Sequence, residues 1–229
     1  STDATPQMLD ALSREHSWIK VVKSEDRGYY LPGTGVVNVF NKGLENVSSP
    51  AWDYIVKLDV DLSFPSDYFE NLLTRFHDDA KLGIASGVTY LNLRGQWVEE
   101  SALDDHPVGP SKVYRRECYL EMGGLMPVPG WDLADILAAQ MNGWTTKCFK
   151  DLIVNHYRIS GTRRGNDWSR LFLQGRLEFR HGYAWWYSSL KSLAHTLRSP
   201  LLIGGVARFS GYFYALTKSD SSTRVISLN

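Results

Sequence analysis

Segments with helical spacing and segments with strand-like spacing alternate along the first half of the chain, and this alternation is its most constraining feature. Apolar strands are expected at 54–58 and 82–91, with helices expected at 36–47 and 66–76. A strand followed by a helix and a further strand forms a crossover unit, which places helices on the faces of a sheet. The pattern therefore predicts an α/β fold with a mostly parallel sheet that is flanked by helices.

Two carboxylates follow the strand at 54–58 directly, in the sequence Asp59-Val60-Asp61. In open α/β sheets, ligands collect at the carboxyl ends of the strands. Two carboxylates held there repel each other unless a cation neutralises them, and a divalent metal with oxygen ligands could do so while also binding a diphosphate. The alternative is that both residues only begin a loop and cap the next helix.

Two further acids and a histidine follow in the later part of the α/β pattern. Asp132 is expected at the start of a helix, where the helix dipole keeps a carboxylate ionised and suited to act as a general base. Asp135 lies one turn later on the same face and is the rival base. His156 is expected to end a strand at 152–156, where a neutral imidazole could complete a metal site with Asp61. The structural alternatives are a helix cap for Asp132 and a buried, hydrogen-bonded histidine.

A basic, glycine-flanked loop separates this region from a helical end of the chain. Arg158, Arg163 and Arg164 could close over phosphates, or they could form an ordinary solvated surface. We place a domain boundary here, which divides the chain into a catalytic part at 1–160 and a helical, amphipathic segment at 161–229.

Composition and charge narrow the choice of function. Of the 229 residues, 43% are hydrophobic, which is typical of a globular protein, and two cysteines are too few for a disulfide framework or a four-cysteine zinc site. The net charge is zero, but residues 158–229 hold 11 basic and three acidic side chains, so this part carries +8 and the part before it −8. A basic segment rich in aromatic residues suits an anionic lipid surface, and we expect peripheral membrane contact through 183–216.

Several short motifs occur in a fixed order: Ser1-Thr2-Asp3-Ala4-Thr5, Asn41-Lys42-Gly43-Leu44, Asp59-Val60-Asp61, Gly123-Gly124, and Trp131-Asp132 with Gly143-Trp144. This ordered set resembles the inverting glycosyltransferases of family 2, which have the GT-A (Rossmann-like) fold. Residues 1–5 resemble the end of that family's D-D-G-S-x-D-x-T segment, Asn41-Lys42-Gly43-Leu44 resembles its N-x-G-L helix, and Asp59-Val60-Asp61 matches its D-x-D. Gly123-Gly124 matches the pair before the acceptor loop, and Trp131-Asp132 with Gly143-Trp144 matches E-D…G-W, with Trp131 in place of the glutamate. The resemblance covers residues 1–160.

The resemblance implies a role for each matching residue. On the metal side, Asp61 would bind Mn²⁺ or Mg²⁺, Asp59 would contact the ribose or the metal, and His156 would be a further metal ligand. The nucleotide-sugar would contact Asp3, Asn41, Arg158 and Arg163. The catalytic base would be Asp132 or Asp135. We therefore expect Asp61, Asp132 and His156 to converge around one pocket.

The implied reaction is metal-assisted transfer of a sugar, with inversion, from a nucleotide-sugar donor to a saccharide or lipid-linked acceptor, in surface polysaccharide or glycolipid synthesis. We expect a cytoplasmic enzyme at the inner face of the cytoplasmic membrane, with no nucleic acid partner. Because the chain begins inside a motif, the sheet should be incomplete at the N-terminus, with about 35–45 residues upstream, and this fragment alone should be inactive. Two alternatives remain: a D-x-D aspartyl phosphohydrolase with Asp59 as nucleophile, and a glycosyltransferase-like module that binds without catalysis.

Overall fold

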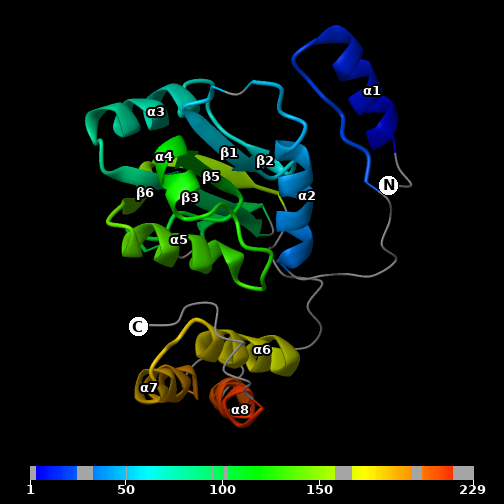
Figure 1. The fold of residues 1–229 in the computed structure, drawn as a ribbon. Helices are drawn as coiled ribbons and strands as arrows, with labels where there is room; N and C mark the ends of the chain where they lie inside the picture. Colours follow the sequence, from blue (N-terminus) through cyan, green and yellow to red (C-terminus); the bar gives the residue numbers. More distant parts are fainter. Residues whose placement is uncertain are drawn as a thin grey trace.

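The computed structural model describes most of the chain as a sheet with helices on both faces and a further layer of helices (Figure 1). The residues it describes are 4–24, 33–49, 51–93, 95–100, 103–157, 167–196 and 203–218.

A six-stranded sheet lies at the centre, in the order β1-β5-β3-β6-β2, with β4 paired to the end of β3. The strands are β1 (Tyr54–Leu58), β2 (Leu62–Ser63), β3 (Leu82–Leu93), β4 (Gln96–Glu99), β5 (Ser111–Arg115) and β6 (Thr145–His156). The strands expected at 54–58 and 82–91 are confirmed. The strand expected at 152–156 is the second half of the longer β6, whose pairing with β3 jumps from Phe149 to Ile153.

The directions of the strands differ from expectation, because the sheet is mixed and not mostly parallel. Among the described strands only β3 and β6 run parallel, whereas the pairs β1–β5, β3–β5, β3–β4 and β2–β6 are antiparallel. The alternation of helix and strand stops after β3, and the chain returns through the β4 hairpin and a loop to β5. A strand entered without a crossover helix pairs antiparallel with its neighbour.

The described residues form eight helices, three of which make up the C-terminal segment. They are α1 (Thr5–Glu15), α2 (Thr34–Leu44), α3 (Tyr68–Asp78), α4 (Arg116–Glu121), α5 (Trp131–Met141), α6 (Asp167–Arg180), α7 (Trp185–Thr196) and α8 (Ile203–Thr217). The helices expected at 36–47 and 66–76 correspond to α2 and α3, with ends that differ by a few residues.

Both faces of the sheet are buried, as the alternation of its core residues shows. On β3, Ile84 packs in a cluster with residues of α2, α4 and α5, whereas its neighbour Ala85 packs with α3. On β5, Tyr114 and Val113 divide between the same two clusters. Because successive side chains of a strand point to opposite faces, a helical layer must cover each face. The expected α/β class, with helices on both sides of the sheet, is confirmed.

The expected C-terminal helical segment is also confirmed, and glycines bring two of its helices into close contact. A Cβ built at Gly175 of α6 would lie 1.9 Å from the carbonyl oxygen of Arg208 on α8, and one at Gly211 would lie 2.0 Å from that of Phe172. The backbones of α6 and α8 can therefore approach each other only because these positions lack side chains.

The helical segment lies on the α5 side of the sheet unit (Figure 1). Within the described residues, no helix combines the length and the hydrophobicity that a bilayer-spanning segment requires. The domain boundary expected between residues 160 and 161 lies outside the described residues, and the division into two domains stays a prediction.

Candidate functional site

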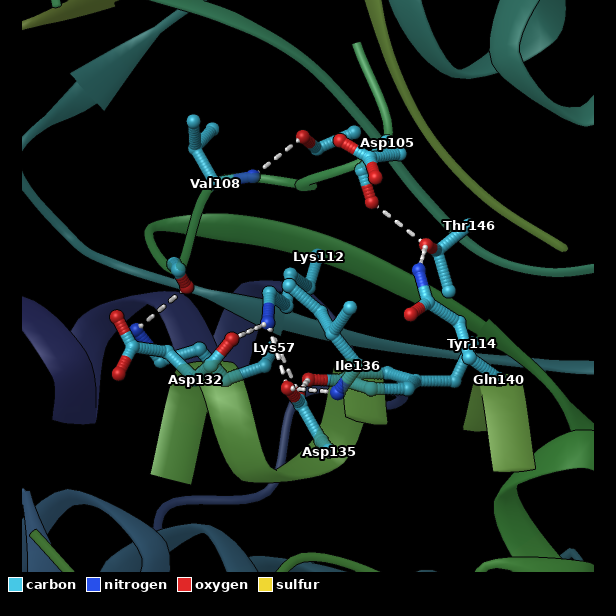
Figure 2. A network of polar contacts seen from close by, with 12 residues as sticks. Lys57, Asp105, Val108, Lys112, Tyr114, Asp132, Asp135, Ile136, Gln140 and Thr146 are labelled. Atoms are coloured by element: carbon cyan, nitrogen blue, oxygen red, sulfur yellow. Dashed lines mark hydrogen bonds and ion pairs between the residues drawn. The ribbon is translucent and has the colours of Figure 1, made fainter. Parts of the chain in front are cut away.

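Asp132 lies in the first turn of α5, and its neighbours fix the position of that turn. Gly130 has a φ of 79°, a left-handed conformation that favours glycine, and leads the chain into α5. The Nζ of Lys112 donates a 2.5 Å hydrogen bond to the backbone carbonyl of Asp132 (Figure 2). The first turn of a helix carries partial positive charge, which stabilises an ionised carboxylate. The side chain of Asp132 is exposed and lines a cavity, so a substrate could reach it.

Asp135 is turned into the protein, where it forms a buried ion pair. The Nζ of Lys112 lies 2.8 Å from Oδ1 of Asp135, and the hydroxyl of Tyr114 donates a 2.6 Å hydrogen bond to Oδ2 (Figure 2). The Lys112 and Asp135 side chains are only 0% and 1% exposed. Burial, together with the charge of Asp135, raises the pKa of Tyr114 well above its usual range, so its hydroxyl remains a donor. Asp135 is not part of the cavity lining.

The first carboxylate of the D-x-D pair, Asp59, is held by a lysine of the strand that precedes it. The Nζ of the buried Lys57 lies 2.5 Å from Oδ1 of Asp59 and donates a 3.1 Å hydrogen bond to the carbonyl of Gly109. The backbone N–H of Asp59 donates to the carbonyl of Pro110 at 2.9 Å. Gly109 and Pro110 line the same cavity as Asp132, so Asp59 lies directly behind one wall of that cavity.

The second carboxylate of the pair, Asp61, lies beside His156. Pairing of β2 with the end of β6 brings them together, with Oδ1 of Asp61 3.7 Å from Nε2 of His156. The other ring nitrogen, Nδ1, lies 3.4 Å from Oε2 of Glu100, an oxygen that also accepts a 2.7 Å hydrogen bond from Thr89. The buried imidazole therefore has one carboxylate near each of its nitrogens.

A cavity of about 830 Å³ connects these two groups of residues. Thr89 and Glu100 line it on the side of His156, and Asp132 lines it from α5. A volume of this size is typical of a site for a small ligand. The structure thus places Asp61 next to His156, and Glu100 links that pair to the cavity that Asp132 lines. Asp61 and His156 do not themselves line the cavity, so the convergence of all three on one pocket stays a prediction.

The residues around Asp61 fit a cation that takes only part of its ligands from the protein. Within the described ranges no cluster of three or more His, Cys, Asp or Glu side chains is placed to hold a metal ion. Asp61 and Nε2 of His156 are close enough to offer two ligands to one ion, while Glu100 is near Nδ1, on the other side of the ring. A carboxylate in that second position fixes the tautomer and orientation of a metal-binding histidine. The remaining ligands would come from a bound molecule and water.

Of the other residues expected at the site, the structure describes only Asn41, which lies elsewhere. Asn41 lines a separate cavity of about 280 Å³, together with Tyr119 and the Gly123–Gly124 turn. Asp3, Arg158 and Arg163 lie outside the described residues. The nucleotide contacts expected of these four residues stay predictions.

Two buried lysines, Lys57 and Lys112, support the site. The sequence offers Lys112 only as a possible acceptor or phosphate contact or as plain surface, and it does not predict the burial of either lysine. The Nζ atoms of both lie 5.4 Å from the ring centroid of Trp131, so both ammonium groups make cation–π contacts with the indole. The sequence signal that could have found them is their position inside short apolar strands, because a lysine buried there needs a charged or aromatic partner.

Comparisons with known proteins support the fold. No protein-family model matches the chain, and no curated protein matches it in sequence. Solved structures do match, and one is a mannosyltransferase, PcManGT from Pyrobaculum calidifontis, in complex with GDP-Man and Mn²⁺. The TM-score is 0.55 at 15% sequence identity, over 95% of this chain and 62% of that chain. This likeness shows that the chain has a glycosyltransferase-like fold and spans less than two thirds of the length of that enzyme.

Proposed function

We propose that the protein is a glycosyltransferase that moves a sugar from a nucleotide-sugar donor to an acceptor hydroxyl, with inversion and with the help of a divalent metal. The observation that supports this proposal is that Asp132 and Glu100 line one cavity, and that Glu100 contacts His156 of the Asp61–His156 pair. Direct displacement requires the base and the donor to be held in one pocket. The fold also supports the proposal, because a mannosyltransferase that binds GDP-Man and Mn²⁺ shares it.

On the donor side, Asp61 and His156 would hold Mn²⁺ or Mg²⁺, and Asp59 would contact the ribose or the metal. His156 would donate its Nδ1–H to Glu100, which fixes the ring and leaves Nε2 for the ion. When bound, the cation would offset the negative charge that develops on the leaving nucleoside diphosphate. Lys57 would hold the carboxylate of Asp59 in place through their 2.5 Å contact.

On the acceptor side, Asp132 would be the catalytic base. It would take the proton of the acceptor hydroxyl, whose oxygen then attacks the anomeric carbon from the face opposite the leaving diphosphate. Asp132 suits this role better than Asp135, because its side chain lines the cavity while Asp135 is buried against Lys112 and Tyr114. Lys112 would be a positioning residue, since it holds the backbone of the turn that carries Asp132.

The biological setting is part of the same proposal. We place the enzyme in family 2, acting on a saccharide or lipid-linked acceptor in surface polysaccharide or glycolipid synthesis at the inner face of the cytoplasmic membrane. Contact with lipid through 183–216 is supported by Trp185 and Trp186 of α7, which are 62% and 54% exposed. Nucleotide contacts would come from Asp3, Asn41, Arg158 and Arg163.

Nucleotide binding and sugar transfer by the full-length protein test this proposal. GDP- and UDP-sugars would be titrated by calorimetry with Mn²⁺ or with EDTA, and release of nucleoside diphosphate would be followed. We expect binding to require the metal and to be lost in Asp61→Asn. Asp132→Asn should bind the donor normally but transfer sugar about 10²–10⁴ times more slowly, as expected for loss of a general base. Asp151→Asn is the matched control, because Asp151 forms a surface ion pair with Arg75.

The alternatives predict different outcomes. Release of inorganic phosphate from a phosphoester, without use of any nucleotide-sugar, would replace the proposal with an aspartyl phosphohydrolase. Nucleotide binding that does not depend on metal, with no turnover of any donor, would favour a binding module. Unchanged transfer in Asp132→Asn would show that another residue is the base.

A further inference from the structure

The helical segment contains a buried carboxylate, Glu178 of α6, that three other side chains contact. Arg208 of α8 donates to Oε1 from Nε at 3.0 Å and also from a second nitrogen, and the hydroxyl of Ser188 donates to Oε2. The Nζ of Lys191 on α7 lies 3.0 Å from Oε1. Burial alone would raise the pKa of Glu178, but these contacts, with Arg208 first, hold it below its usual value. The group is therefore ionised at neutral pH.

This cluster carries one positive charge more than is needed to neutralise Glu178. The side chains of Arg208 and Glu178 are both more than nine-tenths buried and already form an ion pair. Among the residues that the structure describes, Glu178 is the one carboxylate paired with either Arg208 or Lys191. A charge that is partly removed from water is costly unless a counter-ion approaches it. Lys191 can therefore accept a further anionic partner.

Lys191 faces the cavity that also contains Asp132. Its side chain is 33% exposed, and it lines the cavity together with Tyr183 and Tyr187. Its ammonium group lies 4.8 Å and 5.6 Å from the ring centroids of these tyrosines, in cation–π contacts that restrain the side chain. A cation is thus held in the wall of the cavity at a defined place.

The part of the helical segment that lines the cavity packs directly against the turn that carries Asp132. A Cβ at Gly130 would lie 2.6 Å from Cε1 of His181, the residue that follows α6. Tyr183 follows in the same turn, and the hydroxyl of Tyr212 donates a 2.6 Å hydrogen bond to its backbone carbonyl. These contacts fix the position of the cavity wall that contains Lys191 relative to Asp132.

We propose that Lys191, Tyr183 and Tyr187 form a subsite for an acceptor saccharide that carries an anionic group, either a phosphate or a carboxylate. The inference rests on the proposed function, because it takes Asp132 as the group that faces the acceptor hydroxyl. The anion would pair with the ammonium group of Lys191 and accept hydrogen bonds from the tyrosine hydroxyls. Lys191 lines this cavity together with Asp132, whereas Asp61 and His156, the donor-side residues, do not, so we assign the anion to the acceptor.

Comparing neutral and anionic sugars as ligands of the full-length protein tests this proposal. Methyl glucoside, glucose 1-phosphate and glucuronate would be titrated by calorimetry in the presence of Mn²⁺ and GDP or UDP. We expect at least one anionic sugar to bind about tenfold more tightly than methyl glucoside, as a charge-assisted contact allows. Comparison of glucose 1-phosphate with glucuronate identifies whether the site accepts a phosphate or a carboxylate.

Variants of Lys191 test whether this residue causes the preference for anionic sugars. Lys191→Gln should remove the preference for anionic sugars and Lys191→Arg should keep it. Lys42→Gln is the matched control, because the Nζ of Lys42 on α2 donates to the carbonyl of Lys23 at the surface. Glu178 keeps Arg208 and Ser188 as partners in Lys191→Gln, so this variant should fold, and its thermal unfolding midpoint would be measured alongside.

The metal-dependent binding of GDP and UDP, measured on the same samples, separates this proposal from the proposed function. Equal binding of neutral and anionic sugars, or a preference that survives Lys191→Gln, would overturn the subsite and leave the transferase proposal intact. Weaker nucleotide binding in Lys191→Gln would also overturn it, because the lysine would then serve the donor. A preference that depends on Lys191, in a protein that binds neither nucleotide, would support the anion site and contradict the transferase.

Discussion

The buried pair of Lys112 and Asp135 should be the most sensitive point of the fold, and replacement of Lys112 by Met tests this. Methionine fills a similar volume, so the main change is the loss of a charge that balances Asp135 and of the donor to the Asp132 carbonyl. Removing one partner of a buried ion pair costs about 3–5 kcal/mol. Asp135 would keep two donors, the hydroxyl of Tyr114 and the N–H of Ile136, but no countercharge. We therefore expect Lys112→Met to lower the free energy of unfolding by about 3–5 kcal/mol.

A double-mutant cycle separates the charge effect from packing. Asp135→Asn alone leaves Lys112 buried without an anion and should cost a similar amount. In Lys112→Met/Asp135→Asn both charges are gone, and the asparagine oxygen can still accept from Tyr114. The remaining cost is one unsatisfied amide group, about 1–3 kcal/mol. The double variant should thus be at least as stable as either single variant.

Urea unfolding of the full-length protein, followed by circular dichroism at neutral pH, measures all four free energies. Asp151→Asn serves as a surface control that should change stability by less than about 0.5 kcal/mol. If the effects of the two single changes simply add in the double variant, the two groups do not interact as a buried pair and the reasoning is wrong. A cost below about 1 kcal/mol for Lys112→Met would contradict it equally, because burial of the unpaired Asp135 would then carry no penalty.

Two further predictions concern other buried groups. Burial lowers the pKa of His181 below 6.5, and hydrogen bonds to the backbone of Leu177 and Gly130 offset this only in part. The unfolded chain therefore binds more protons than the folded one, and the free energy of unfolding should fall as the pH drops below 6.5. Urea unfolding at several pH values should show a weaker pH dependence in His181→Phe than in the unchanged protein. Burial also raises the pKa of the Cys118 thiol to about 12, so mass spectrometry should find it alkylated by iodoacetamide only after unfolding.

Much of the fold follows from local patterns in the sequence, but strand direction does not. The apolar runs of β1 and β3 and the helical spacing of α3 are visible in the sequence because each buries one regular face. The antiparallel entry of β5 depends on the absence of a crossover helix before Ser111, in a stretch without clear periodicity. A strand of two residues such as Leu62–Ser63 is too short to leave any pattern, although it brings Asp61 to His156.

The positions of candidate site residues were predictable where they follow a motif, and not where they depend on contacts between distant segments. The D-x-D pair and Asp132 stand out because carboxylates follow a strand or begin a helix. Lys112 meets Asp135 only after β5 and α5 have packed together, so no local pattern reveals the pair. Lys191 lies in a helix whose spacing indicates only an amphipathic surface, and its place beside the cavity depends on how α7 docks.

The position of Trp131 has a consequence for how this site could have changed during evolution. The family that the sequence resembles has a glutamate there, whereas the indole of this chain lies 5.4 Å from the ammonium groups of both Lys57 and Lys112. Each lysine holds one carboxylate, Asp59 or Asp135. A glutamate at 131 would compete with both for the same two cations. An exchange between tryptophan and glutamate at this position would therefore require a compensating substitution at one of the lysines or their partners.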